Sequence, residues 1–294
     1  MKVLVLNCGS SSLKYQVINM DNESVICKGN FQRIGEKESF LLHKINGQKF
    51  EIKKVAMDHS EALKIIMEEL QNPDHKAIES LSEINAIGHR IVAGGEIFNK
   101  SVVINEKTLA QIDSCSKLAP LHNPAAILGI KACQKLMPGT PMVGVFDTAF
   151  HQTMPKENYL YSIPQKYYEK YGIRKYGAHG TSHRYVSNAV ANLMNKDIKN
   201  LKIITCHLGQ GSSICAVEFG KSVETSMGLT PLGGLPMVTR SGDLDPSVVT
   251  AIMKQENLTP DEMEKILNKE SGLAAIAQYA PDFREIEAAS RKRK

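Results

Sequence analysis

The chain reads VLVLNCGSSSLKYQV at residues 3–17, and a similar stretch, IITCHLGQGSSICAV, follows at residues 203–217. Each consists of an apolar strand, a tight turn of Gly and polar residues, and a second strand. Glycine lets the backbone approach a ligand closely, and successive N–H groups in such a turn can bind an anion. A single Gly-Ser turn is usually an ordinary hairpin loop. Two with matching flanks indicate two related half-molecules, each presenting a phosphate-binding hairpin to one cleft, and so predict a nucleotide phosphotransferase.

The composition is that of a globular protein of about two domains. The chain has 294 residues, of which 42% are hydrophobic, and its formal net charge is +5. The basic tail at residues 291–294 supplies four of these charges, so the rest of the chain is nearly neutral. This balance, the lack of Trp and the few aromatic residues argue against a nucleic-acid partner.

The cysteines and the apolar segments predict a cytoplasmic protein. The six cysteines form no C-x-x-C pair, and several lie in apolar strands, so they are expected to be reduced and mostly buried. The apolar run at the N-terminus ends at Asn7, which is too early for a signal peptide. No apolar run reaches the roughly 18 residues that a membrane span requires.

The order of predicted elements favours an α/β fold in two domains, residues 1–149 and 150–294. The first 55 residues are rich in strand signals. Helices are expected near 60–70, 105–117 and 124–137, with strands at 84–88 and 142–146.

The second half repeats this order in part from about residue 201. A helix is expected from Ser182 to Leu193, followed by the second hairpin and a loop-rich stretch at 225–246. Thr259 begins a capping box with Pro at the first helical position, and Gly272 is a plausible helix stop. A last helix is expected at 282–290.

Two polar residues follow apolar strands in the first half. Asp147 comes at the end of one strand and is either a catalytic carboxylate or the N-cap of a helix. Arg90 follows another strand and precedes Gly94 and Gly95. It could hold a ligand carboxylate by two hydrogen bonds, or it could form a surface ion pair.

Two further candidates lie in the second half. His179 and His183 have the spacing of a zinc-protease helix, but Gly180 stands where the motif requires Glu, so a zinc site is not favoured. His179 is expected ahead of the helix, either bonding phosphoryl oxygens or in a structural role. Arg240 lies in a Gly- and Pro-bounded loop, and it either neutralises a phosphoryl group or belongs to an ordinary turn.

Taken together, these segments resemble the acetate/propionate kinase family over almost the whole chain. The strings that carry the resemblance are LNCGSSSLKY (6–15), HRIVAGGE (89–96), LAPLHNP (118–124), FDTAFH (146–151), YGIRKYGAHGTSH (171–183), HLGQGSS (207–213), TRSGDLDP (239–246) and LNKESGL (267–273). The resemblance implies an α/β fold of duplicated actin/Hsp70/sugar-kinase-like (ribonuclease H-like) domains. It also implies reversible, direct in-line transfer of the ATP γ-phosphoryl group to acetate, with Mg²⁺ as cofactor.

The resemblance also implies roles for individual residues. The catalytic positions are Asp147, as acid/base, and His179 and Arg240, which stabilise the transition state. The substrate positions are Arg90, which binds the acetate carboxylate, and Val92, Leu121 and Pro231 around its methyl group. The nucleotide positions are Lys14, His207, Leu208, Gly209, Gln210, Gly211, Asp282, Phe283 and Arg284, and Asn7 helps to place Mg²⁺.

Family members are homodimers and continue beyond the last residue of this sequence. We therefore expect a C-terminally shortened chain with an incomplete second domain, which puts the turnover of the isolated chain in question. Ala178 stands where the family carries Phe in the acetate pocket, and this predicts weaker discrimination between acetate and propionate. Two alternatives stay open: a non-catalytic relative that serves as a phosphate-binding or interaction module, and a different kinase or ATPase on the same fold.

Overall fold

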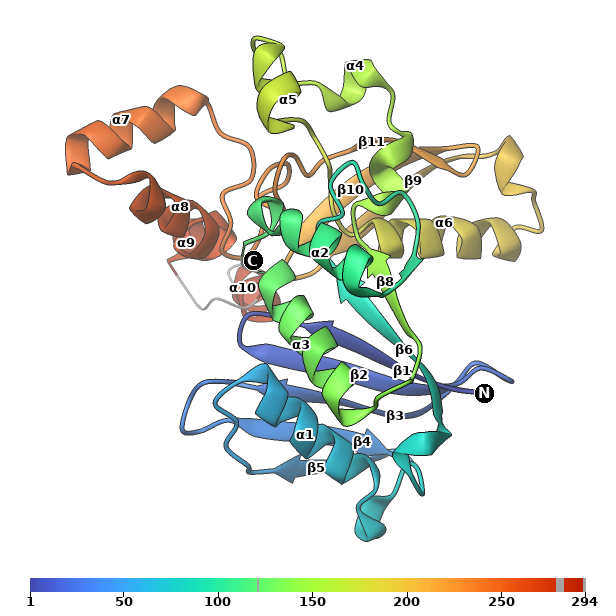
Figure 1. The fold of residues 1–294 in the computed structure, drawn as a ribbon. Coiled ribbons are helices and arrows are strands. Elements are labelled where there is room, and N and C mark those ends of the chain that lie inside the picture. Colours follow the sequence, from blue (N-terminus) through green and yellow to red (C-terminus); the bar gives the residue numbers. More distant parts are fainter. Residues whose placement is uncertain (121, 279–282, 293–294) are drawn as a thin grey trace. The chain divides into compact units, whose positions relative to one another are not determined.

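A computed structural model describes residues 1–120, 122–278 and 283–292. The chain divides into two compact units, Met1–Ala149 and Phe150–Lys294. Each unit combines a β-sheet with helices (Figure 1), which confirms the predicted α/β class.

The described part of the N-terminal unit is built on an eight-stranded sheet with the order β5-β4-β3-β2-β1-β6-β8-β7. Its strands are β1 (Lys2–Cys8), β2 (Ser12–Asn19), β3 (Ser24–Gln32), β4 (Phe40–Ile45), β5 (Gln48–Ile52), β6 (Ile84–Ile91), β7 (Val102–Val103) and β8 (Met142–Phe146). Strands β1 to β5 form an antiparallel meander. By contrast, β6 runs parallel to both β1 and β8. The carboxyl ends of β1, β6 and β8 therefore meet at one edge of the sheet.

Two helices cover one face of this sheet (Figure 1). They are α1 (His59–Leu70) and α3 (Asn123–Leu136), which pack against each other and against β1, β2 and β6. Asp58 caps α1 by accepting from two backbone N–H groups, and the apolar side of the helix is fully buried. A third helix, α2 (Glu106–Ser114), packs against α3. All three were predicted from the sequence, α1 from its apolar positions.

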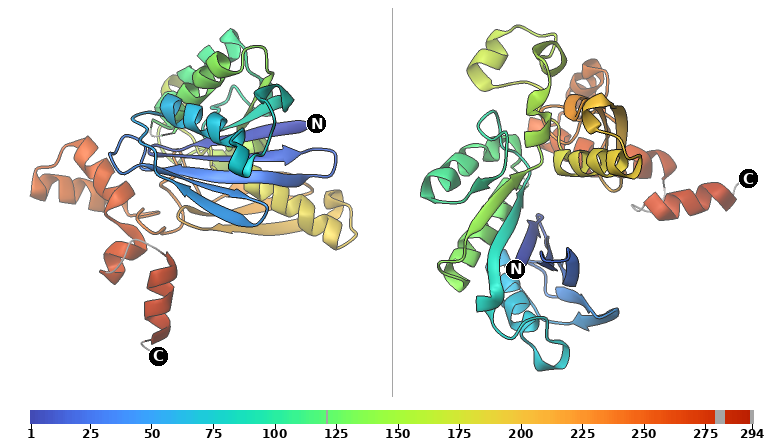
Figure 2. Two further views of the ribbon diagram at one scale, coloured as in Figure 1. Left: turned by 90° about the horizontal axis from the view of Figure 1, so that it is seen from below. Right: turned by 90° about the vertical axis from the view of Figure 1, so that its right-hand side faces the viewer.

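The described part of the C-terminal unit contains a three-stranded antiparallel sheet with the order β11-β10-β9. Its strands are β9 (Lys202–Leu208), β10 (Ser212–Glu218) and β11 (Lys221–Thr225). Helix α6 (Gly180–Leu193) packs against β9 (Figures 1 and 2). The other helices are α4 (Lys156–Tyr159), α5 (Lys166–Tyr171), α7 (Pro246–Glu256), α8 (Pro260–Lys269), α9 (Gly272–Ala277) and α10 (Phe283–Lys292).

Several helices differ from those predicted, and α4, α5 and α7 were not predicted at all. Helix α6 begins at Gly180 instead of Ser182, because His179 adopts a left-handed conformation (φ 60°) and occupies the N-cap position. Helix α7 was not predicted, although Asp245 caps it. Gly272 begins α9 instead of ending α8. Its φ of +72° and the Met237 carbonyl oxygen, 2.3 Å from where a Cβ would lie, require glycine there.

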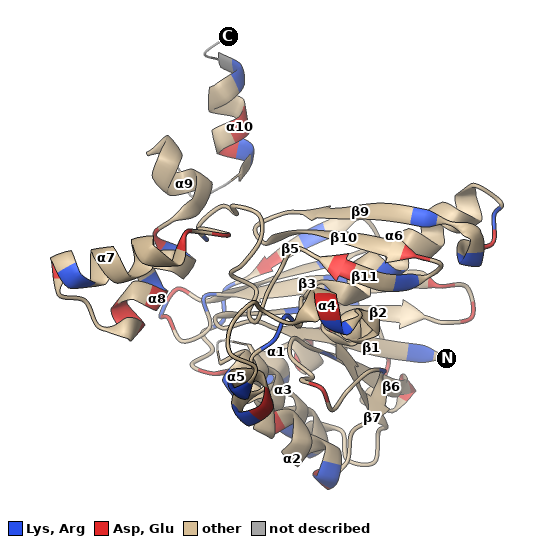
Figure 3. Cartoon of the chain, turned by 90° about the horizontal axis from the view of Figure 1, so that it is seen from above, with Lys and Arg blue, Asp and Glu red and all other residues tan. Residues whose placement is uncertain are grey.

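Both predicted hairpins are confirmed. In the first, β1 pairs with β2 so that Asn7 faces Lys14, and in the second, β9 pairs with β10 so that Leu208 faces Ser212. The six cysteines all lie among the described residues and are free thiols, and only Cys206 is exposed. Acidic and basic residues occur together on α7, α8 and α10 (Figure 3), as expected for solvated helices. Within the described ranges, no helix combines the length and apolar character needed to span a bilayer.

Candidate active site

Three predicted site residues of the N-terminal unit are joined by hydrogen bonds. Asn7 lies near the end of β1, Arg90 near the end of β6, and Asp147 directly after β8. The Nε and Nη2 of Arg90 donate to the Asp147 carboxylate at 3.1 and 2.6 Å, and its Nη1 donates to Asn7 Oδ1 at 3.1 Å. The parallel arrangement of the strands therefore brings the three side chains together.

The Arg90–Asp147 contact is a partly buried ion pair, in which the Asp147 side chain is 2% exposed and the Arg90 side chain 36%. Burial disfavours the charge on Arg90, but the carboxylate outweighs this effect and holds the pKa of the guanidinium above its usual value. Sequence reasoning did not foresee that Arg90 would bind Asp147. One N–H on each terminal nitrogen is not used in these contacts, which leaves donors for a ligand carboxylate.

Lys14 and Asn7 are paired across the first hairpin, and the Lys14 side chain is exposed. The turn between them is closed by a hydrogen bond from Gly9 N–H to the Ser12 carbonyl at 2.8 Å. His59 Nε2 contacts the Gly9 carbonyl at 2.7 Å and fixes this end of the turn. The hairpin thus presents an amine and an amide from neighbouring positions.

The residues expected around the acetate methyl group have different surroundings. Val92 is buried in a small apolar cluster with Ala93 and Ala119. The carbonyl of Pro231 accepts a hydrogen bond from Arg240 Nη1 at 3.2 Å. Leu121 lies outside the described residues.

In the C-terminal unit, two predicted catalytic residues lie against the turn of the second hairpin. A methyl group on Gly211 would lie 3.3 Å from His179 Nε2 and 3.4 Å from Arg240 Nη1. The imidazole of His179 stacks on that of His207, with ring centroids 4.0 Å apart. Burial lowers the pKa of Arg240. This arrangement places two positively charged or proton-donating groups beside the exposed backbone of the turn, as phosphate binding requires.

A small apolar cavity of about 210 Å³ lies beside the same turn. It is lined by Leu208, Gly209, Ser212, Leu235, Pro236, Met237, Val238, Leu273 and Phe283. Phe283, at the start of α10, thus shares a cavity with the turn, as a nucleotide-binding role requires. Arg284 follows it on α10 and is exposed, whereas Asp282 lies outside the described residues.

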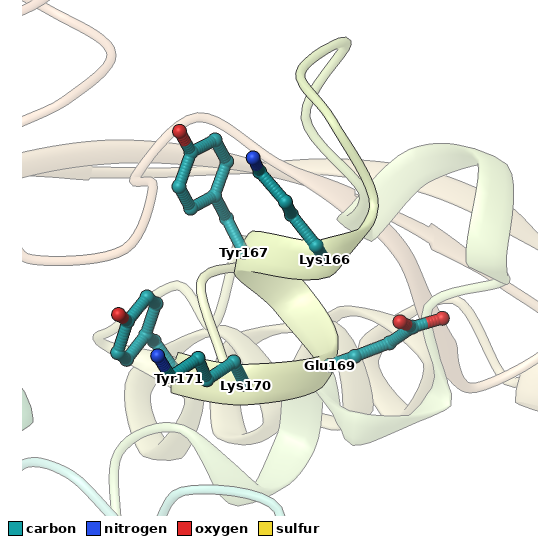
Figure 4. A pocket seen from close by; sticks show the side chains of 5 residues that line it. All are labelled: Lys166, Tyr167, Glu169, Lys170 and Tyr171. Atoms are coloured by element: carbon teal, nitrogen blue, oxygen red, sulfur yellow. The ribbon is translucent and has the colours of Figure 1, made fainter.

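A second pocket lies on α5 and is separate from the hairpin turn (Figure 4). Its lining comes from this one short helix and consists of Lys166, Tyr167, Glu169, Lys170 and Tyr171. None of the predicted site residues lines it.

The metal-binding potential of the N-terminal cluster rests on oxygen ligands. Asn7 offers an amide oxygen and Asp147 a carboxylate, the ligand types that Mg²⁺ prefers. Among the described residues there is no group of three His, Cys, Asp or Glu side chains that could hold a metal ion. The cluster therefore fits an ion held by one or two protein oxygens together with substrate phosphates.

A family model described as "Acetokinase family" matches residues 2–294. The chain belongs to the acetokinase family. A curated acetate kinase from Thermoanaerobacterium thermosaccharolyticum is 56% identical over 99% of this chain and 73% of its own length. An acetate kinase from Clostridium kluyveri is 53% identical over 98% of this chain and 71% of its own length.

Solved structures of acetokinases agree. The Porphyromonas gingivalis acetate kinase and a propionate kinase from Francisella tularensis each give a TM-score of 0.93 at 44% identity. Each match covers 99% of this chain and 73% of the other. The family and its relatives identify the chain as a phosphotransferase of the acetate kinase type, and the predicted family and enzyme class are confirmed.

Proposed function

We propose that the described clusters carry out reversible transfer of the ATP γ-phosphoryl group to acetate or another short carboxylate. A carboxylate oxygen attacks the γ-phosphorus, the bond to the bridging oxygen breaks, and ADP leaves with the electron pair. A carboxylate is ionised at neutral pH, so no proton has to be removed from it. The protein then has to position the reactants and neutralise charge.

The observation that carries this proposal is the position of His179 and Arg240 at Gly211. Phosphoryl transfer spreads negative charge over three oxygens, and an arginine beside a phosphate-binding turn stabilises that charge. We assign this role to Arg240. His179 would donate a hydrogen bond to the same group.

The N-terminal cluster would bind the acceptor and the metal. We assign the acetate carboxylate to the remaining N–H groups of Arg90, with the methyl group near Val92. Since the attacking carboxylate needs no base, the pairing with Arg90 suggests that Asp147 orients the guanidinium. Asn7 and Asp147 would hold Mg²⁺, which screens phosphate charge when bound, and Lys14 would contact the phosphates.

The second hairpin and α10 would bind the nucleotide. The turn from His207 to Gly211 would hold phosphates through its backbone N–H groups. Phe283 and Arg284 would lie near the adenosine. As in the family, we propose a cytoplasmic homodimer.

The direct test is formation of acyl phosphate from ATP, Mg²⁺ and a series of carboxylates, trapped as the hydroxamate. Acetate and propionate should both be converted, and butyrate should be converted less well. A chain that binds ATP but forms no acyl phosphate from any of them would instead be a phosphate-binding module.

A further inference from the structure

The loop after β6 carries Val92, and its backbone is held by side chains from two other segments of the N-terminal unit. Val92 and Ala93 are buried with Ala119 in a small apolar cluster. Val92 is two residues beyond Arg90, the guanidinium to which the acceptor carboxylate is assigned. The course of this loop therefore determines where an apolar side chain lies beside the acceptor.

Asn123, in the first turn of α3, binds both peptide groups of Ala93. The Ala93 N–H donates to Asn123 Oδ1 at 3.1 Å, and Asn123 Nδ2 donates to the Ala93 carbonyl at 2.9 Å. Both residues are buried, and Asn123 has no exposed surface. A carboxamide offers an acceptor and two donors, so it can pair with the N–H and the C=O of one residue as a neighbouring strand would. These two bonds attach the loop to the start of α3.

Thr148, which directly follows Asp147, holds the next residue of the loop. The Gly94 N–H donates to Thr148 Oγ1 at 3.0 Å, and Thr148 is buried. The Gly94 carbonyl accepts from the Phe98 N–H at 3.1 Å. A Cβ on Gly94 would lie 3.0 Å from the side chains of Phe98 and Phe146, so the backbone packs closely on these two residues. Consecutive polar groups of the loop backbone therefore have partners, which restrains the loop.

We propose that Asn123 and Thr148 are positioning residues that hold Val92 beside the acceptor carboxylate and thereby limit the length of the carboxylic acid that reacts. They act through the loop backbone, and neither side chain has to touch the substrate. The inference rests on the proposed acceptor site at Arg90. It deepens that site by naming the groups that fix its apolar side.

The physical reason is the cost of leaving a buried peptide group without its partner. When the acceptor of a buried N–H is removed, the backbone gains by shifting until that N–H reaches water or another acceptor. A shift of this loop displaces Val92. The displaced side chain contacts the methyl group of acetate less well and leaves room for a longer carbon chain, so discrimination by size declines.

The first test replaces the hydroxyl of Thr148 with a methyl group of similar size. In Thr148→Val the ratio of kcat/KM for acetate to kcat/KM for butyrate should fall about tenfold. The change should lie in the KM for the carboxylate, with the KM for ATP nearly unchanged. Thr148→Ser keeps the hydroxyl acceptor and should restore most of the ratio.

A second variant tests the other contact of the loop. Asn123→Asp keeps an acceptor for the Ala93 N–H, but it turns an oxygen instead of an NH₂ group towards the Ala93 carbonyl. It should lower the same ratio. An unchanged ratio in both Thr148→Val and Asn123→Asp would overturn the inference.

The matched control is the same substitution at another threonine of the N-terminal unit. Thr108 Oγ1 also accepts from a backbone N–H, that of Asn105, at 2.7 Å. This contact lies at the start of α2, where the Ile104 N–H donates to the Met142 carbonyl at the amino end of β8. Thr108→Val should lower the urea midpoint but leave the acetate-to-butyrate ratio unchanged. An equal fall of the ratio in Thr108→Val and Thr148→Val would show a general loss of stability instead of positioning.

A binding measurement separates this inference from the proposed function. Methyl NMR of the full chain labelled in valine, with Val92→Ala to assign the signals, follows titration with acetate and with butyrate in the presence of ADP and Mg²⁺. If the wild type forms no acyl phosphate but acetate shifts the Val92 signals, and Thr148→Val weakens this binding, the positioning stands and the proposed reaction is wrong. If turnover is normal but the ratio is unchanged in Thr148→Val, the function stands and the inference is wrong. If acetate neither reacts nor shifts the Val92 signals, the acceptor site and the inference are both wrong.

Discussion

The guanidinium of Arg90 binds the buried carboxylate of Asp147 through Nε and Nη2, and its third nitrogen, Nη1, binds Asn7. This pairing connects the ends of three strands and leaves part of the guanidinium for a ligand. It makes the acceptor site depend on an ion pair within the protein. The stability and the activity of the chain should therefore both respond to changes at Arg90.

Arg90→Ala should destabilise the fold and raise the KM for acetate. Removing the arginine deprives the buried Asp147 carboxylate of this cationic partner, which we expect to cost about 2–4 kcal/mol of unfolding free energy. The double variant Arg90→Ala/Asp147→Ala should recover part of that loss. Urea unfolding measures the stability of the single and the double variant, and steady-state kinetics measures the KM for acetate.

The matched control is Arg33→Ala, since Arg33 forms an exposed ion pair with Glu38. Its cost should stay below about 1 kcal/mol. An equally small cost for Arg90→Ala would show that Asp147 does not depend on its partner.

Gly211→Ala should reduce turnover while leaving most of the stability intact. The added methyl group would lie 3.2–3.4 Å from His179 and Arg240, closer than ordinary contact, so both side chains must shift. Displacement of catalytic groups by even about 1 Å can cost about a hundredfold in rate. Steady-state kinetics and urea unfolding separate the two effects.

Gly88→Ala serves as the control, because a Cβ there meets only Val5, at 4.0 Å. Its turnover should remain close to that of the wild type. A Gly211→Ala enzyme with wild-type kcat would show that the turn tolerates a side chain at this position.

Acidification should destabilise the chain partly through His89. Burial lowers the pKa of this histidine to about 4, below the unfolded value near 6.5. The unfolded state therefore binds more protons between these values, and stability is lost as pH falls from about 6.5 towards 4. Urea midpoints at pH 7 and pH 5 should differ less in His89→Leu than in the wild type. Identical pH dependence in the two proteins would rule out His89 as a contributor.

Ala178→Phe should destabilise the C-terminal unit. Ala178 is buried against Met227 and Met237, which are themselves fully buried, so the phenyl ring has no space unless these methionines repack. Such overpacking typically costs about 1–3 kcal/mol. Thermal unfolding measures this loss of stability. Ala178→Ser is the control, because it changes the side chain without adding a ring. If Ala178→Phe is as stable as the wild type, an aromatic ring fits at this position. The ratio of turnover with acetate to turnover with propionate in that variant then tests the predicted loss of discrimination.

Local signals in the sequence predicted much of the fold. The two hairpins follow from short apolar strands around Gly-containing turns, and α1 and α8 follow from periodicity and capping residues. Helix α7 was missed because its pattern is weak and none of its residues is buried. The Asp245-Pro246 pair could have indicated its start.

Long-range pairing was harder to predict. The sequence placed Arg90 and Asp147 each at the end of a strand, but their contact depends on β6 lying beside β8. Likewise, the contacts of Ser213 with His179 and His183 require β10 to bring a serine to two histidines that are about one helical turn apart. Such contacts are set by sheet order and register, which short motifs do not encode.

The most direct test of the account compares acetyl phosphate formation by Arg240→Gln and by Arg33→Gln with that of the wild type, at saturating ATP, Mg²⁺ and acetate. Arg240 lies at the phosphate-binding turn, so its loss should lower kcat about a thousandfold without unfolding the chain. The exposed Arg33 should be dispensable. Wild-type turnover in Arg240→Gln, or no acetyl phosphate from the wild-type chain, would contradict the account.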